Sequence, residues 1–194
     1  MKLGLILVIL VVLAGVGSYA LSNHSSSSVV QSPKSAAVVP AKSAKTHVAV
    51  RPNPCAGNTF DKLALVSISQ RHMWACQGTT LMYNSAVVTG MENLAADLTP
   101  TGTYHVYAKE TNLYLNGSDS TGSWHDYVNY WMPFLDNQYG AYGFHDATWR
   151  PANAFGNISP YSSNASHGCV ELPLATAKWL YNWVAIGTTV TIES

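Results

Sequence analysis

The sequence predicts a mainly β domain of the sandwich or barrel-like kind, with a single helix near its C-terminal end. Short runs rich in β-branched and aromatic residues recur between residues 60 and 150, and Gly, Pro, Asn and Asp separate them. Within the same domain only residues 174–185 carry apolar side chains at helical spacing. Hydrophobic residues make up 47% of the 194-residue chain, enough for a sizeable core. Many short strands with one helix favour two packed sheets.

Two N-terminal segments precede this domain. Residues 1–21 are almost entirely apolar after Lys2, and their length is close to the roughly 20 residues that span a bilayer. They form either a signal peptide, cleaved near Ala20, or an uncleaved membrane anchor. Residues 22–54 consist mostly of Ser, Ala, Val, Pro and Lys, a composition typical of a flexible tether. We therefore expect residues 55–194 to form a domain outside the cytoplasm, in the cell envelope.

Charge is unevenly distributed along the chain. All ten acidic residues follow residue 52, whereas five of the ten basic residues precede it. The folded part has no basic cluster, which argues against a nucleic-acid partner. The basic tether either touches an anionic membrane or wall polymer or is simply solvated.

The expected elements follow from the positions of the turn residues. Strands are expected at residues 63–69, 73–76, 81–89, 103–108, 113–115, 127–134, 141–145, 170–172 and 188–192, and a helix at 174–185. Gly and Ser make residues 117–122 a turn, and residues 91–98 and 151–164 read as loops.

The chain has three cysteines, which leaves one unpaired if a disulfide forms. The first two expected strands, 63–69 and 73–76, would form a hairpin. In that hairpin Cys76, at the end of the second strand, lies beside the start of the first strand. Cys55 lies eight residues before that start, within reach of Cys76. In an oxidising compartment we expect a Cys55–Cys76 disulfide and a free Cys169, the alternative being three free thiols.

The stretch from Ser166 to Val170 carries the strongest chemical signal. It reads Ser-His-Gly-Cys-Val, and a cysteine becomes a strong nucleophile when a neighbouring group promotes its thiolate. Gly168 leaves the backbone bare for a substrate carbonyl, and the N–H groups of Gly168 and Cys169 could face the oxyanion. His145 lies on a separate segment and is the candidate general base.

Other interpretations of these residues and of the nearby aromatics remain open. Cys169 could be a buried structural thiol, and His145 a satisfied core residue. A zinc site made of His145, His167 and Cys169 is conceivable, but no usual ligand spacing supports it, so no metal is expected. The aromatic residues near the site could line a substrate groove or belong to the core. They are Trp124, Tyr127, Tyr130, Trp131, Trp149 and Tyr161.

These motifs resemble the L,D-transpeptidases with a YkuD-type catalytic domain. The resemblance is carried by Phe144-His145-Asp146 and Ser166-His167-Gly168-Cys169-Val170, with Val88-Thr89-Gly90 and Thr99-Pro100-Thr101-Gly102-Thr103 upstream. Together they span most of residues 60–192. The sequence departs from the family pattern at Glu171, where Asn or Arg is usual, and in a longer gap before Ser166 that places extra residues in 151–164.

The resemblance implies a cysteine acyltransferase. It makes Cys169 the nucleophile and His145 its activator, with the backbone carbonyl of Asp146 orienting the imidazole. His167 and Ser166 would support the pocket. The implied donor is a peptidoglycan tetrapeptide stem and the acceptor a second stem, giving a 3→3 cross-link through a thioester. The resemblance implies no cofactor and carbapenem-type β-lactams as inhibitors.

Alternatives remain for the role of Glu171 and for whether the protein is a transpeptidase. On a strand, Glu171 shares the face of Cys169, so it either holds a substrate ammonium or is a solvated charge at the rim. A wall-binding module without turnover would explain the tether and the aromatics but leave His145 and Cys169 without purpose. A hydrolytic member of the same family remains possible, whereas NlpC/P60 peptidases place the cysteine before the histidine.

Overall fold

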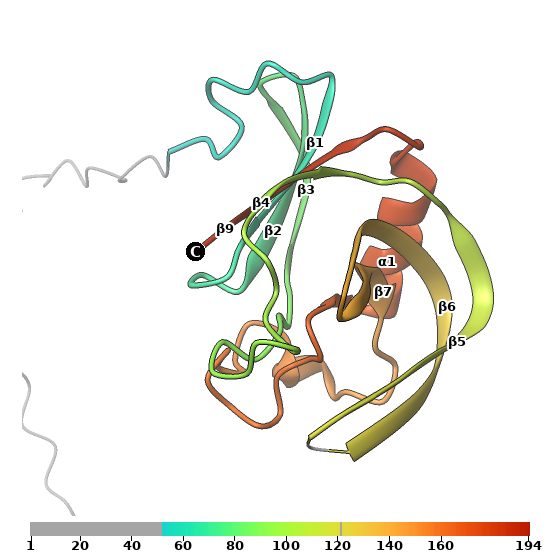
Figure 1. Ribbon diagram of the computed structural model, residues 1–194. Helices are drawn as coiled ribbons and strands as arrows, with labels where there is room; N and C mark the ends of the chain where they lie inside the picture. Colours follow the sequence, from blue (N-terminus) through green and yellow to red (C-terminus); the bar gives the residue numbers. More distant parts are fainter. Residues whose placement is uncertain (1–51, 121) are drawn as a thin grey trace, which may run out of the picture. The chain divides into compact units, whose positions relative to one another are not determined.

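A computed structural model describes residues 52–120 and 122–194 of the protein (Figure 1). The expected leader, residues 1–21, and the tether up to residue 51 lie outside the described residues. The described part contains strands β1 Lys62–Ser67, β2 His72–Gln77, β3 Thr80–Ala86, β4 Gly102–His105, β5 Glu110–Asp119, β6 Gly122–Asn137, β7 Gly140–Asp146, β8 Val170–Leu172 and β9 Thr189–Glu193, the helix α1 Leu174–Trp183 and the 3-10 turn η1 Ala152–Ala154. The expectation of a mainly β domain with one α-helix is confirmed for this part.

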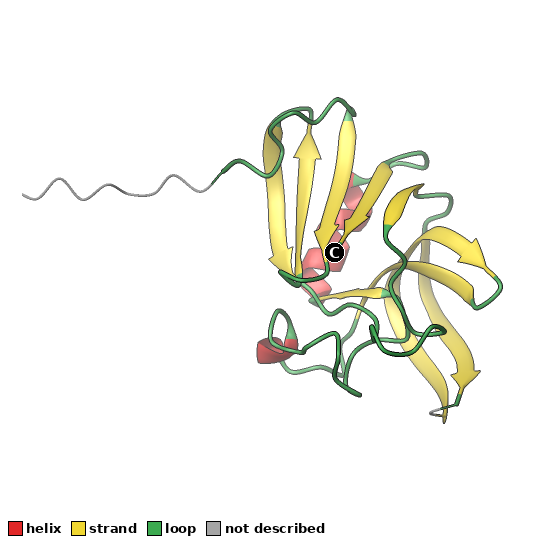
Figure 2. Cartoon of the chain, turned by 60° about the vertical axis from the view of Figure 1, so that its left-hand side comes forward, coloured by secondary structure: helices red, strands yellow, loops and turns green. Residues whose placement is uncertain are grey.

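The strands form two sheets, which Figure 2 shows with α1 packed behind them. The five-stranded sheet has the order β3-β2-β1-β9-β4, and the four-stranded sheet the order β5-β6-β7-β8. Neighbours are antiparallel except β1–β9 and β7–β8, which are parallel. In the parallel β7–β8 pair, His145 is level with Glu171, so this pairing brings the two candidate-site segments side by side.

The main core lies between the sheets and the helix. Alternate residues of β1 and β9 point into it, as expected for strands with one covered face. The fully or almost fully buried members include Val66, Met73, Met132, Phe134, Phe144, Leu172, Ala177, Leu180, Val190 and Ile192. The helix residues Ala177 and Leu180, and Val184 just after the helix, are buried in this core. Tyr181, on the same apolar face, is partly buried and packs against the core.

The β5–β6 hairpin is longer than the sequence suggests. The expected strands 113–115 and 127–134 extend to Asp119 and back to Gly122, so most of the expected turn 117–122 is strand. The physical reason lies at Gly117, where a Cβ would lie 2.0 Å from the Trp124 ring. Gly117 therefore makes room for an indole on the opposite strand rather than marking a turn.

The expected strand 81–89 also ends early, because the chain crosses from one sheet to the other. β3 ends at Ala86, and two of the residues after it form isolated β-bridges with β8 of the four-stranded sheet and with the segment just before β8. Val88 pairs with Glu171, and Gly90 pairs with Ser166. The segment after β3 thus lies directly against the Ser-His-Gly-Cys stretch.

A disulfide and a packed loop lie outside the main core. Cys55 and Cys76 form a disulfide with a Cα–Cα distance of 5.5 Å, beside Leu63 in a small separate cluster. Residues 151–164, expected as a loop, contain η1 and are packed down through buried Phe155. In the described residues, no helix is both long and apolar enough to cross a membrane.

Candidate active site

Three motif segments meet at one threonine. The Thr99 hydroxyl accepts the backbone N–H of Gly90 (2.8 Å) and donates to the carbonyl of Gly168 (2.8 Å). A backbone bond from Ser166 to the Thr89 carbonyl (3.0 Å) closes the same junction. Thr99 is fully buried, so both of its bonds are shielded from water. The sequence analysis named Thr99 only as part of the Thr99–Thr103 motif and gave its side chain no role.

The backbone beside the cysteine is held in a conformation that favours glycine. Gly168 has a φ of 105°, and a Cβ there would lie 2.3 Å from the Tyr142 ring. Ser166 Oγ accepts the Gly168 N–H (3.2 Å) and donates to the Cys169 carbonyl (2.5 Å). This local bonding fixes the loop that carries Cys169, and it uses the Gly168 N–H that the sequence analysis assigned to an oxyanion.

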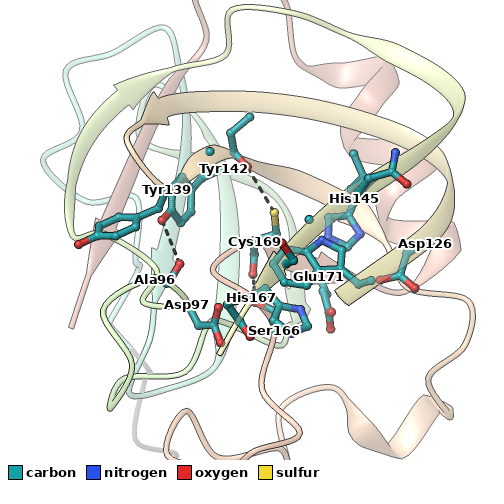
Figure 3. Close-up of a pocket in the computed structure, with 18 of the residues that line it drawn as sticks. Ala96, Asp97, Asp126, Tyr139, Tyr142, His145, Ser166, His167, Cys169 and Glu171 are labelled. Carbon is teal, nitrogen blue, oxygen red and sulfur yellow. Dashed lines mark hydrogen bonds between the residues drawn. The ribbon is translucent and has the colours of Figure 1, made fainter. Parts of the chain in front are cut away.

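Cys169 and His145 lie side by side in a pocket of about 600 Å³ (Figure 3). Cys169 is partly exposed, and its Sγ lies 4.0 Å from the carbonyl oxygen of Ala141. His145, at the end of β7, is only 5% exposed and lines the same pocket as Cys169. Indole rings of Trp131 and Trp149 lie about 6 Å from the imidazole (centroids at 5.9 and 6.0 Å).

The tautomer of His145 is set by its neighbour. Nδ1 donates to the backbone carbonyl of Asp146 (3.0 Å), which leaves Nε2 as the ring nitrogen for Cys169. The Asp146 side chain is buried and accepts the N–H groups of Asn129 (2.8 Å) and Tyr130 (2.8 Å) and the Asn129 amide (2.7 Å). Asp146 therefore ties β7 to β6 and orients the imidazole with its main chain.

Burial and charge act on His145 in opposite directions. Burial alone lowers the pKa, since it disfavours the charged ring. The hydrogen bond to Cys169, the negative charges of Cys169 and Glu171 and the bond to Asp146 outweigh it and raise the pKa of His145 to about 9. The geometry thus favours an imidazolium beside the sulfur at neutral pH.

Glu171 does not have the surroundings of a solvated rim charge, so that interpretation is wrong. The residue is 4% exposed, and its carboxylate is bound by Arg150 through Nε to Oε2 and Nη2 to Oε1, the latter at 3.0 Å. Arg150 also donates to the Asn164 carbonyl (2.9 Å). The alternative role of holding a substrate ammonium stays a hypothesis. The sequence analysis gave Arg150 no role, although it is the only lysine or arginine between Lys109 and Lys178.

His167 lies at the pocket wall rather than against the His145 ring. Its imidazole stacks on Trp124, with centroids 3.9 Å apart and planes at 10°. Two carboxylates approach it, Asp97 from the loop before β4 and Asp119 from the end of β5. Burial, together with the hydrogen bond and charge of Asp119, raises the pKa of Asp97 to about 7. No sequence signal marked these acids, because they meet only through the fold.

The aromatic residues named in the sequence analysis fall into different classes. Trp124 and Trp131 line the pocket, and Trp131 is also 6% exposed. Tyr130 packs on the main core, whereas Tyr127, Trp149 and Tyr161 are exposed. Only some of them could therefore contact a substrate.

Comparison with known proteins agrees with this geometry. Residues 61–192 match the YkuD family, described as the L,D-transpeptidase catalytic domain. The putative L,D-transpeptidase YciB of Bacillus subtilis (strain 168) is 24% identical over 130 residues, which cover 66% of this chain and 63% of that protein.

Solved structures show the same fold. The catalytic domain of the Enterococcus faecium L,D-transpeptidase is 29% identical, with a TM-score of 0.58 over 70% of this chain and 99% of that one. The Ldtfm–avibactam carbamoyl enzyme is 28% identical, with a TM-score of 0.59, and the match covers 70% of this chain but only 49% of that one. The chain thus spans about half to two thirds of the length of the longer relatives. It belongs to the YkuD family of L,D-transpeptidase catalytic domains.

Proposed function

We propose that this protein is a peptidoglycan L,D-transpeptidase that forms 3→3 cross-links through a thioester on Cys169. The observation that carries the proposal is the placement of His145 beside the free, partly exposed Cys169 in one open pocket (Figure 3). A nucleophile within reach of a base that is itself oriented by a third group is the arrangement that acyl transfer needs. Here the Asp146 carbonyl is the orienting group.

Acylation begins with attack of the Cys169 sulfur on the carbonyl carbon of the L-residue at position three of a tetrapeptide stem. The S–C bond forms, and the carbonyl oxygen becomes an oxyanion. The C–N bond to the terminal D-alanine then breaks, and the His145 imidazolium gives its proton to the departing amine. His145 is left neutral, ready to act as a base in the second half of the reaction.

Deacylation reverses these roles. The amine of a second stem attacks the thioester carbon, and neutral His145 accepts a proton from that amine. The sulfur leaves as a thiolate, and the new amide is the 3→3 cross-link. The second step needs an acceptor that can enter the same pocket. Residues of the β5–β6 hairpin line that pocket, so the acceptor would pass close to this hairpin.

For the oxyanion we propose the Cys169 N–H rather than the Gly168/Cys169 pair expected from the sequence. The Gly168 N–H already donates to Ser166 Oγ, so the Cys169 N–H is the member of that pair that we assign to the oxyanion. The Ser166–Gly168 bond would then hold the loop rigid while charge develops on the substrate.

Placement in the cell envelope and inhibition by carbapenems belong to the same proposal. The Cys55–Cys76 disulfide supports an oxidising compartment, reached through residues 1–21 as a signal peptide or an anchor. The related E. faecium catalytic domain, 29% identical, is also known acylated by ertapenem. We expect carbapenems to acylate Cys169 in this protein.

The test is incubation with a disaccharide-tetrapeptide, with mass spectrometry of protein and products. We expect an adduct that lacks the terminal D-alanine, followed by a cross-linked dimer. Cys169→Ala should show neither, nor a carbapenem adduct, while keeping its fold. A tripeptide product without dimer would indicate the hydrolytic alternative. Binding to peptidoglycan with no adduct and no product would favour the wall-binding alternative and refute transpeptidation.

A further inference from the structure

Asp97 is a buried acid, and among the described residues its carboxylate has no hydrogen-bonding neighbour except a second acid. Its side chain is 1% exposed, and within residues 52–120 and 122–194 neither carboxylate oxygen receives an N–H or O–H from a neutral or basic group. A buried carboxylate without donors is costly, since it has lost its water and gained nothing in return. The neighbour it does have is another acid, Asp119.

Asp97, Asp119 and His167 come from three separate parts of the chain. Asp97 lies in the loop between β3 and β4, Asp119 ends β5 at the hairpin tip, and His167 precedes the catalytic cysteine by two residues. One ligand atom from each lies within 4.8 Å of the others. All three line the pocket that contains Cys169. Figure 3 shows Asp97 and His167 together at its edge.

The repulsion between the adjacent carboxylates of Asp97 and Asp119 is relieved by a shared proton or by a cation bound between them. A shared proton would satisfy Asp97 and Asp119 but offers nothing to His167. Stacking on Trp124 engages the faces of the His167 ring and leaves its nitrogens, which lie at the ring edge, available to a metal. Two carboxylate oxygens and one imidazole nitrogen are donors that zinc accepts, with a fourth position for water.

From this geometry we propose that Asp97, Asp119 and His167 form a binding site for a zinc-class divalent cation at the rim of the pocket. The site differs from the His145/His167/Cys169 set considered from the sequence, because it uses neither His145 nor the sulfur. A cation here would clamp the tip of the β5–β6 hairpin to the loop before β4 and to the loop that carries Cys169. It would regulate access to the pocket rather than take part in the chemistry at Cys169.

The test measures zinc binding to the full chain carrying Cys169→Ala, which removes the sulfur as a competing ligand. Isothermal titration with Zn²⁺, followed in parallel by the intrinsic tryptophan fluorescence to which the stacked Trp124 contributes, should show saturable binding. Asp97→Asn and Asp119→Asn in the same background should each weaken that binding by about 10-fold or more. Asp126→Asn, a carboxylate that lines the same pocket outside the cluster, is the matched control and should bind zinc as its parent does.

Three results would overturn the proposal: no zinc binding, binding that neither Asp97→Asn nor Asp119→Asn weakens, or a preference for Mg²⁺ over Zn²⁺. Thermal unfolding without metal checks that the variants fold. If Asp97→Asn fails to fold, Asp119→Asn still tests the site, because Asp119 is only partly buried at the hairpin tip. The measurement involves no turnover, so its failure would leave the transpeptidase proposal standing, and failure of that proposal would not affect the zinc measurement.

Discussion

His145 combines a buried position with a raised pKa, and that combination predicts a pH profile. Because its folded-state pKa of about 9 lies above the ordinary value, the imidazolium persists through neutral pH and is lost as pH rises through about 9. Acylation by the stem peptide needs that proton for the departing D-alanine. We therefore expect the acylation rate to fall above about pH 9.

His145→Gln should remove this falling limb and lower the rate at neutral pH by about 10²–10⁴-fold. The measurement is single-turnover acylation across pH 6–10.5 in both proteins. His167→Ala is the matched control, and it should reduce the rate while keeping the falling limb. If the limb vanished only in the His167 variant, the roles of the two histidines would have to be exchanged.

Glu171 and Arg150 form a second residue-scale test, on stability. Arg150→Met would leave a nearly buried carboxylate without its partner, which costs about 3–5 kcal/mol of unfolding free energy in buried pairs. Adding Glu171→Gln should recover much of that loss, since the uncompensated charge is gone. Urea unfolding of the two single variants and the double variant measures the coupling. A loss below about 1 kcal/mol for Arg150→Met would mean that the pair behaves like an exposed one.

At the scale of elements, the catalytic loop depends on a contact between segments that lie far apart in sequence. Thr99→Val keeps the side-chain size but leaves the Gly90 N–H and the Gly168 carbonyl without partners, at about 1–3 kcal/mol for each buried group. Thr99→Ser retains the hydroxyl and should stay close to the wild type in melting temperature. We expect Thr99→Val to lower both the melting temperature and the acylation rate. Equal activity in the two variants would show that Thr99 supports the fold without positioning Cys169.

The same scale shows what sequence could and could not predict. Strands 63–69, 73–76, 141–145 and 170–172 and the helix were located within one or two residues at most ends, because alternating burial and helical spacing are local properties. The β5–β6 hairpin was underestimated because Gly117 serves a ring on the opposite strand, which local sequence does not reveal. The pairs Arg150–Glu171 and Asp97–Asp119 and the Thr99 bonds were missed for a related reason. Each joins residues that only the fold brings together.

At the scale of the whole molecule, the disulfide that stabilises the domain and the pocket that contains Cys169 use different residues. The Cys55–Cys76 disulfide belongs to a small cluster with Leu63 at the start of the domain, whereas the main core and the pocket use other residues. It closes a loop with a sequence separation of 21, for which the chain-entropy account gives about 3 kcal/mol. Replacing both cysteines by serine should therefore lower the melting temperature by roughly 6–12 °C.

The acylation rate per folded molecule should stay unchanged in that double variant below its melting transition, because the cluster around the bridge includes none of the residues that line the pocket. Wild-type protein treated with a reductant that leaves Cys169 available should shift in melting temperature by the same amount, which separates loss of the bridge from effects of the serines. The measurement pairs differential scanning calorimetry with carbapenem adduct formation at 25 °C. If adduct formation slowed while the protein remained folded, the disulfide would be coupled to the site. The β1–β9 pairing would then be the connection to test. It joins β1, which follows Cys55, to β9, which follows β8 and α1 in the chain.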